Sequence, residues 1–341
     1  MTSAEAFHAT LHSVISRHLG PPGEISNLTR LTGGATRVTW SFDALVGDRL
    51  QPLILQQCPP RQSTDGDPVE RMARVIGGMD AALMQDAEQA GVPAPHVRLF
   101  LQDDDGLEPG FITDRIEGET IGGRIVRSET LAAARESMAR QCGEILARIH
   151  RMDASRHSFL IEHTAAQQVS TYRDIWDRFD HPHPAMDLGF RWAAEHLPAA
   201  APLCLVHGDF RNGNFVVGPN GIRAVLDWEL AHRGDPMEDL GWLCMRTWRF
   251  GGDGPVGGFG RREDLFESYE QAGGMRVDPE RVRFWEAFGC LKWAVMCMIK
   301  GQGYLGDRDR GGGVRSVEAL AIGRRVSEPI YDFLNLVYLR G

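Results

Sequence analysis

The most constraining feature of this sequence is a short polar loop between two apolar runs. Both runs predict strands, and the loop between them carries His207, Asp209 and Asn214. A third apolar run follows and ends in Asp227. Such a loop either carries chemistry or is a polar turn in which Asp and Asn only cap the backbone. The three strands are predicted over 203–207, 214–217 and 222–227.

The spacing of these residues favours chemistry. A His, an Asp two residues later and an Asn five residues after that is the order of the protein-kinase catalytic loop. Asp209 is therefore predicted to receive the proton of an attacking hydroxyl. Asn214 and Asp227 offer the hard oxygen ligands that suit Mg²⁺, an ion that keeps several of its waters. His207 is expected to brace the loop backbone rather than to transfer a proton.

The first 115 residues predict a small sheet with one inserted helix. Apolar residues at helical spacing open the chain, and short strand-like runs separated by turn residues follow. The predicted strands are 25–31, 36–45, 50–57, 96–101 and 110–116, and the predicted helices are 3–19 and 68–90.

From residue 116 onwards the pattern becomes mainly helical. A helix is predicted over 128–152, with Ser128 as a candidate N-cap. Glycines at 251–260 and 311–313 indicate mobile loops, the first of them a candidate lid. A chain of 341 residues is long for one core, so we expect an α+β protein with lobes at 1–115 and 116–341. Further helices are predicted in pieces over 170–196 and over 235–250, 261–273, 279–300 and 314–339.

Composition excludes several classes of protein. The 37 basic and 46 acidic residues give a formal charge of −9, which opposes non-specific binding of nucleic acid. The six cysteines are scattered without zinc spacing, as in a protein with reduced thiols. No apolar run reaches the roughly 20 residues that span a bilayer, and the N-terminus lacks a signal-peptide pattern. We expect a cytoplasmic protein that contacts neither nucleic acid nor membrane.

The chain resembles the aminoglycoside phosphotransferase-like family of the kinase-like superfamily. The resemblance implies a protein-kinase-like two-lobed fold with a small β-rich N-lobe and a larger helical C-lobe. It also implies ATP or GTP, Mg²⁺ and a small molecule whose hydroxyl accepts the γ-phosphoryl group. Three further segments resemble the branch related to the kinase-like domain fused to some acyl-CoA dehydrogenases. That branch favours a hydroxy acid or its thioester over an aminoglycoside-like amino alcohol. The matching segments are LVHGDFRNGNFVV…AVLDWELAHRGDPMEDLGWL for the family, and WRFGGDGPVGGFGRREDL, RFWEAFGCLKW and AIGRRVSEP for the branch.

The resemblance assigns roles to residues outside the loop. Gly33 and Gly34 resemble the turn that covers the phosphates, although a plain hairpin turn looks the same. Residues 111–118, which include Thr113 and Arg115, resemble the hinge that meets the adenine. Asp239 resembles the acid that hydrogen-bonds the catalytic loop, and we interpret it as structural.

Other residues keep two interpretations. Glu229 either helps with a second metal or the substrate, or is a solvated carboxylate. Glu286 and Lys292 are candidate substrate contacts, and salt bridges explain them equally well.

The small lobe departs from the family pattern at Gln56. The family usually places a Lys or Arg there, on the third strand, to pair with the nucleotide phosphates. Glutamine carries no charge, so that charge-assisted contact is lost. Arg37 is the first candidate to substitute for the missing cation, and Arg61 is the second. The helical acid that would orient the cation is Asp80 or Glu70.

This departure leaves three functions open. The first is a small-molecule kinase in which another cation substitutes. The second is a degenerate kinase-like protein that binds a metabolite or partner without catalysis. The third is an enzyme that transfers the nucleotidyl group instead of the γ-phosphoryl group. The intact trio of Asp209, Asn214 and Asp227 favours catalysis, because a binding protein has no physical need for a base with two metal ligands.

Overall fold

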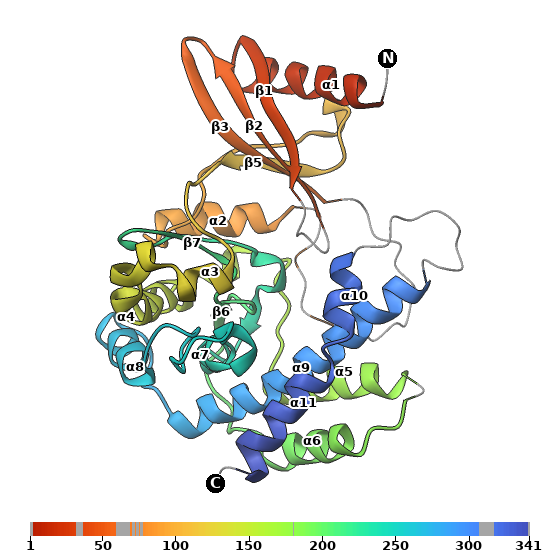
Figure 1. Ribbon diagram of the computed structural model, residues 1–341, viewed down its shortest axis with the longest axis vertical. Coiled ribbons are helices and arrows are strands. Elements are labelled where there is room, and N and C mark those ends of the chain that lie inside the picture. Colours follow the sequence, from red (N-terminus) through yellow and green to blue (C-terminus); the bar gives the residue numbers. More distant parts are fainter. Residues whose placement is uncertain are drawn as a thin grey trace. The chain divides into compact units, whose positions relative to one another are not determined.

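The computed structural model describes residues 3–31, 37–58, 69, 72, 75, 78–179, 181–306 and 317–339 (Figure 1). The described residues form two compact units. The first comprises those up to residue 58 and those of Val75–Glu117, and the second comprises residues 69 and 72 and those from 118 onwards. The units therefore divide between 117 and 118, two residues beyond the boundary expected from the sequence. No helix among the described residues is long and apolar enough to cross a bilayer.

The first unit is built on a five-stranded antiparallel sheet. Its strand order is β1-β2-β3-β5-β4, so the sheet places β3 between β2 and β5. Gln56 on β3 lies opposite Thr39 on β2 and Phe111 on β5. This register puts Gln56 in the middle of the sheet. The strands are β1 (Pro22–Leu31), β2 (Val38–Val46), β3 (Arg49–Gln57), β4 (Val97–Phe100) and β5 (Gly110–Asp114).

One helix supplies the apolar cover of this sheet. Leu11 and Ile15 of α1 (Ser3–His18) are fully buried in one cluster with Phe42, Leu53 and Leu55 of the strands. Leu11 and Ile15 are four residues apart and so share a helix face. Leu53 and Leu55 are two residues apart and so share one face of β3. The helical and the strand periodicity of the sequence thus meet in one core.

The predicted helix over 68–90 is too long. Among the described residues of 68–90, those of α2 (Asp80–Gln89) are α-helical, and residues 69, 72, 75, 78 and 79 lie outside this helix. Gly78 has φ +80°, a left-handed conformation that an α-helix cannot contain. The helix therefore starts after Gly78, which makes Asp80 its first residue.

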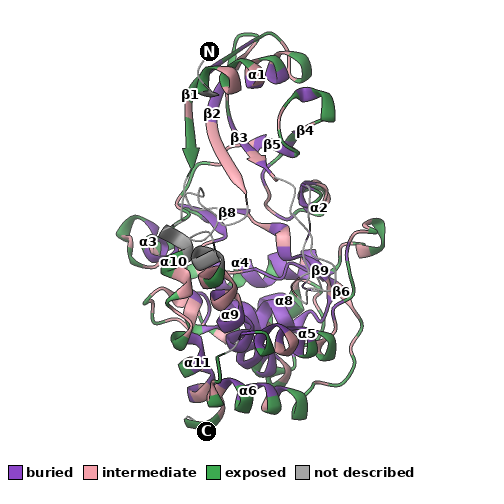
Figure 2. Cartoon of the chain, turned by 90° about the vertical axis from the view of Figure 1, so that its right-hand side faces the viewer, coloured by how far each residue is buried: buried purple, intermediate pink, exposed green. Residues whose placement is uncertain are grey.

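The second unit combines two small two-stranded sheets with helices. In one sheet β6 pairs with β9, and in the other β7 pairs with β8. The long helix α9 packs against α7, α10 and α11, and it is largely buried (Figure 2). The strands are β6 (Cys204–Val206), β7 (Phe215–Gly218), β8 (Gly221–Val225) and β9 (His232–Gly234); the helices are α3 (Gly122–Arg127), α4 (Ala132–His150), α5 (Ala165–Asp177), α6 (Pro184–Glu195), α7 (Met237–Cys244), α8 (Arg262–Gln271), α9 (Pro279–Gly306), α10 (Val317–Gly323) and α11 (Ser327–Leu334).

Two predicted helices have different bounds in the structure. The helix that begins at Ala132 is not capped by Ser128, whose Oγ lies 2.8 Å from Oγ1 of Thr130 instead of accepting a backbone N–H. The helix predicted over 235–250 ends at Cys244, and a separate 3₁₀ turn, η6 (Arg246–Arg249), follows it. Met245 between them has ψ 140°, which a continuing helix does not allow.

The glycine-rich segment 251–260, predicted as a mobile loop, is a packed turn in the structure. Two β-bridges join Gly254 to Gly258 and Val256 to Gly260, and Val256 is fully buried. The Gly257 N–H donates to the Leu243 carbonyl oxygen at 3.1 Å. These backbone hydrogen bonds hold the segment in place. The second predicted loop, 311–313, lies outside the described residues.

Helices α4 and α8 approach each other at Gly143. A Cβ built on Gly143 would lie 2.5 Å from the Leu265 carbonyl oxygen and 2.7 Å from the Tyr269 nitrogen, both of them backbone atoms of α8. Glycine is therefore required for this contact. The contact also brings Tyr269 beside His150 at the end of α4, where the Tyr269 hydroxyl oxygen lies 2.8 Å from Nδ1 of His150.

We expect Gly143→Ala to lower the free energy of unfolding by about 1–3 kcal/mol, because the backbone of α8 must move to admit the methyl group. The neighbouring exposed Glu144→Ala is the matched control. It removes only a surface pair with Arg148 and should cost about 0.5 kcal/mol or less. Urea denaturation measures both. Equal effects of the two substitutions would contradict close packing at Gly143.

Candidate active site

The loop that carries the predicted catalytic residues joins β6 to β7. Glycines allow its course, since Gly208 has φ +79° and Gly213 has φ +100°. A Cβ on Gly208 would collide with the backbone carbonyl of Leu230. The loop thus passes against the backbone that follows β8, close to the segment that contains Asp227.

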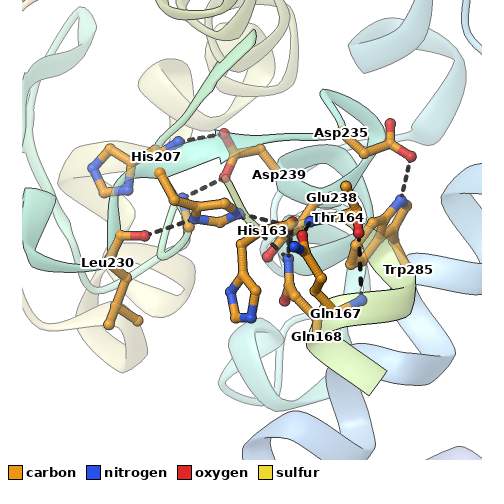
Figure 3. A network of polar contacts seen from close by, with 12 residues as sticks. His163, Thr164, Gln167, Gln168, His207, Leu230, Asp235, Glu238, Asp239 and Trp285 are labelled. Atoms are coloured by element: carbon orange, nitrogen blue, oxygen red, sulfur yellow. Dashed lines mark hydrogen bonds and ion pairs between the residues drawn. The ribbon is translucent and has the colours of Figure 1, made fainter. Parts of the chain in front are cut away.

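Asp239, at the start of α7, holds the loop by its backbone. Its Oδ2 accepts the N–H of His207 at 2.8 Å and its Oδ1 accepts the N–H of Gly208 at 2.9 Å (Figure 3). Nε2 of His150 lies 3.1 Å from Oδ2. Burial by itself would raise the pKa of Asp239, but the hydrogen bond and charge of His150 and the contacts with His207 hold that pKa below its ordinary value. These contacts agree with a structural role for Asp239.

Asp209 lies within reach of three hydrogen-bond donors. Its Oδ1 accepts Nε of Arg211 at 2.9 Å and Nε1 of Trp242 at 2.8 Å, and its Oδ2 accepts Nδ2 of Asn214 at 2.7 Å. The structure therefore brings Asp209 and Asn214 into direct contact. Sequence reasoning missed Arg211 and Trp242, although both lie in the segments that match the family.

The amide orientation of Asn214 fits a metal ligand. An ionised carboxylate only accepts hydrogen bonds, so the amide nitrogen of Asn214 must face Asp209 and its oxygen is directed elsewhere. The backbone carbonyl oxygen of Asn214 accepts the N–H of Leu226 at 2.8 Å, which fixes the position of the residue before Asp227. Asp227 itself has φ +65°, an uncommon conformation for a residue with a side chain. One carboxylate and one amide oxygen, completed by water, match the preference of Mg²⁺.

His207 braces the loop, as expected from the sequence. Its Nδ1 lies 3.2 Å from the N–H of Asp209, and its ring packs against Trp228 with centroids 4.6 Å apart. Full burial lowers the pKa of His207. A neutral ring whose Nδ1 accepts the backbone N–H of Asp209 is suited to fixing the turn.

In the first unit, Arg37 reaches the place that the family gives to a strand-borne cation. Its Nη1 lies 2.5 Å from Oδ2 of Asp80 and 3.1 Å from Oε1 of Gln56. The kinase fold pairs a Lys on its third strand with an acid on the following helix. Here the acid on α2 is Asp80, which is fully buried, and the cation comes from the residue before β2.

The remaining predicted nucleotide contacts have other surroundings. Thr113 is buried inside β5, between β3 and β4. The guanidinium of Arg115 lies 2.8 Å from Oδ1 of Asp43 and donates to Oγ of Ser41 at 3.0 Å, so it ties the end of β5 to β2. A role for either side chain at the nucleotide stays a prediction. Outside the described residues lie Gly33, Gly34, Arg61 and Glu70.

A cavity of about 480 Å³ lies in the second unit. Arg246 and Arg249 of η6, Glu286 of α9 and Asp332 of α11 line it, and both acids have arginine partners. Glu286 also accepts Nη2 of Arg262 at 2.7 Å. Among the described residues, no group of three or more His, Cys, Asp or Glu side chains is arranged to hold a metal ion.

The chain matches the model of the phosphotransferase enzyme family (APH) over residues 27–285. It therefore belongs to this family, and the resemblance inferred from the loop and its flanking strands is confirmed. Curated relatives include acyl-CoA dehydrogenase family member 10 of Mus musculus, 31% identical over 174 residues, and member 11 of Rattus norvegicus, 35% identical over 141 residues. The matches span 48% and 37% of this chain but only 16% and 18% of those relatives.

Solved structures confirm the two-lobed kinase-like fold. A Ralstonia eutropha protein assigned to the aminoglycoside phosphotransferases has a TM-score of 0.70 at 20% identity, with 96% of this chain and 97% of that chain covered. A spectinomycin phosphotransferase in complex with ADP and spectinomycin has a TM-score of 0.62 at 15% identity, with 95% and 97% covered. At this identity the likeness establishes the fold and no more.

A buried polar network lies beside the loop-holding acid Asp239 (Figure 3). Oε2 of Glu238 accepts Nε2 of Gln168 at 2.6 Å and lies 3.1 Å from Nε2 of His232, while its Oε1 accepts Nζ of Lys292 at 2.9 Å. Glu286 and Lys292, which were among the candidate substrate contacts, are both buried in ion pairs.

His163 borders this network without a hydrogen bond at Nε2. Burial, and after it the charge of His232, lower the pKa of His163 from 6.5 to about 3. Between these values only the unfolded chain binds the proton, so acidification below pH 6.5 destabilises the fold.

We predict that wild-type protein loses about 1 kcal/mol more stability between pH 7 and pH 5.5 than the His163→Phe variant does. The physical reason is that Phe has no proton to bind in the unfolded chain. Urea denaturation at the two pH values measures the difference. Exposed His181→Gln is the control and should keep the wild-type dependence. A wild-type dependence in His163→Phe would show that His163 also binds its proton in the fold.

Proposed function

We propose that this protein is an ATP- and Mg²⁺-dependent kinase that transfers the γ-phosphoryl group to a hydroxyl of a small molecule. The observation that carries the proposal is the direct contact of Asp209 with Asn214, whose backbone carbonyl oxygen also accepts the N–H of Leu226, the residue before Asp227. Membership of the phosphotransferase family supports it, as do solved structures of phosphotransferases in complex with ADP that share the fold. GTP is the alternative donor.

In this proposal the residues divide the work of phosphoryl transfer. Asn214 and Asp227 would hold Mg²⁺, which supplies positive charge to the phosphates when bound. Asp209 receives the proton of the acceptor hydroxyl. Arg37, oriented by Asp80, provides the cation that Gln56 does not. A base held by three donors is already oriented before the acceptor arrives, which favours in-line transfer.

We propose a hydroxy acid or its thioester as the acceptor. The curated relatives are acyl-CoA dehydrogenase family members, and acyl-CoA is itself a thioester. The cavity supports the same choice, because its acids Glu286 and Asp332 are offset by arginines. A polycationic amino alcohol would instead need carboxylates without such partners.

The first experiment compares wild-type protein with Asp209→Ala. We expect Mg²⁺-dependent binding of a non-hydrolysable ATP analogue in both, since Asp209 acts on the acceptor, and a fall in turnover of about a hundredfold or more in the variant. Calorimetry measures binding. Mass spectrometry measures phosphorylated lactate, hydroxybutyrate and hydroxybutyryl-coenzyme A, with kanamycin as the amino-alcohol comparison.

Each contrary outcome has its own meaning. Equal turnover in Asp209→Ala would remove Asp209 from the reaction. Absence of nucleotide binding in the wild type would favour a degenerate protein that binds a metabolite or partner. A product that carries the mass of a nucleotidyl group would indicate the third function, nucleotidyl transfer.

Arg37→Ala should reduce kcat/KM for ATP about 100-fold, because it removes a cation predicted to contact the phosphates. It also leaves Asp80 buried without this partner. In the double variant Arg37→Ala with Gln56→Lys, a lysine on β3 regains at least about tenfold of the loss, since it restores the usual strand-borne cation of the fold. Thermal unfolding of both variants separates stability from affinity. Wild-type kinetics in Arg37→Ala would exclude this role for Arg37.

A further inference from the structure

The two carboxylate oxygens of Asp209 have different surroundings. Oδ1 accepts two donors, Nε of Arg211 at 2.9 Å and Nε1 of Trp242 at 2.8 Å. Oδ2 accepts one, Nδ2 of Asn214 at 2.7 Å. A carboxylate has about four lone-pair sites on its two oxygens, which is about two for each oxygen. The two donors therefore occupy Oδ1, while Oδ2 retains room for one more hydrogen bond.

We propose that Trp242 is a positioning residue, which together with Arg211 occupies Oδ1 of Asp209 and so makes Oδ2 the oxygen that receives the acceptor proton. The inference rests on the proposed function. In the reaction the acceptor O–H bond breaks and its proton goes to Oδ2. The acceptor oxygen bonds to the γ-phosphorus of ATP, and the bond from that phosphorus to the bridging oxygen breaks, which releases ADP.

The position of Trp242 is fixed by its neighbours in the second unit. The side chain belongs to α7 and is 2% exposed. Nζ of Lys292 lies 5.1 Å from the ring centroid, a cation–π contact, and Lys292 is in turn held by Glu238 at 2.9 Å. Gly241, the preceding residue, has no room for a Cβ, which would lie 2.7 Å from Cβ of Trp285 on α9. Helix α7 is thus pressed against α9, and the indole N–H is aimed at Asp209.

The same unit holds a second tryptophan of matched geometry. Nε1 of Trp285 donates to Oδ2 of Asp235 at 2.8 Å, and Trp285 is also 2% exposed (Figure 3). Both bonds join a buried indole to an aspartate, and a hydrogen bond to a charged group stabilises a fold more than one between neutral groups. Replacing either tryptophan with Phe should therefore cost similar stability. Only Trp242 contacts the predicted base, so only its loss should change catalysis.

The kinetic test compares Trp242→Phe with Trp285→Phe. The acceptor is whichever of lactate, hydroxybutyrate, hydroxybutyryl-coenzyme A and kanamycin the wild type phosphorylates fastest. In Trp242→Phe we expect kcat to fall at least about tenfold, as for the loss of one preorganised donor, with both KM values within about threefold of wild type. Trp285→Phe should keep kcat within about threefold. Wild-type kcat in Trp242→Phe, or an equal fall in both variants, would overturn the inference.

A second measurement does not depend on the folding of Trp242→Phe. In ¹⁵N spectra of the eight tryptophan indoles, Asp209→Ala should move one resonance upfield, because a hydrogen bond to a carboxylate deshields the proton. Trp285→Phe should remove a different resonance. If Asp209→Ala moves no resonance, or the one that Trp285→Phe removes, the inference is wrong. A wild type that phosphorylates no acceptor overturns the proposed function instead, and the spectra still decide whether Trp242 binds Asp209.

Discussion

The loop that carries Asp209 and Asn214 depends on one buried carboxylate, that of Asp239. Backbone N–H groups buried in a turn need partners, and the loop finds two of them in this single side chain. Asp239 is fixed in turn by His150 at the end of α4, and His150 lies beside Tyr269 of α8. Three helices that meet in the core therefore set the position of a loop that none of them contains. The close approach of α4 and α8 at Gly143 belongs to the same arrangement, because it brings Tyr269 to His150.

The first unit solves a different electrostatic problem. A buried acid such as Asp80 is costly without a cation, because the interior screens and solvates charge poorly. The fold usually supplies that cation from the third strand, but this chain has Gln56 there and supplies Arg37 from the residue before β2. The pairing of a cation with the acid on the helix is kept, although the cation is an arginine and comes from the residue before β2 instead of from β3. One nitrogen of the Arg37 guanidinium, Nη1, contacts both Gln56 and Asp80.

The predicted base and the predicted metal ligands are held in place by different contacts. Around Asp209 the donors come from the loop itself and from α7, so the base is oriented by a helix that is pressed against α9. Around Asn214 the backbone is held by the hydrogen bond from the Leu226 N–H to the Asn214 carbonyl oxygen and by the left-handed conformation of Asp227. Both arrangements fix side chains before any ligand binds, which lowers the entropy lost when the reacting groups are brought together.

The sequence alone determined the parts of this protein that depend on local order. His207, Asp209 and Asn214 share one loop, so their spacing predicted the candidate site, and apolar runs predicted the strands on either side. It did not decide contacts between distant residues. It named Arg37 and, beside Glu70, Asp80, but the contact of these two spans 43 residues. The contact of Trp242 with Asp209, which it missed, spans 33 residues, and both contacts depend on how a helix docks. The packed turn at 251–260 was missed for the same reason, since its glycines indicate mobility until Leu243 and Asn212 supply partners for its backbone. Such contacts form only after the chain has packed, because neither partner carries a local signal for the other.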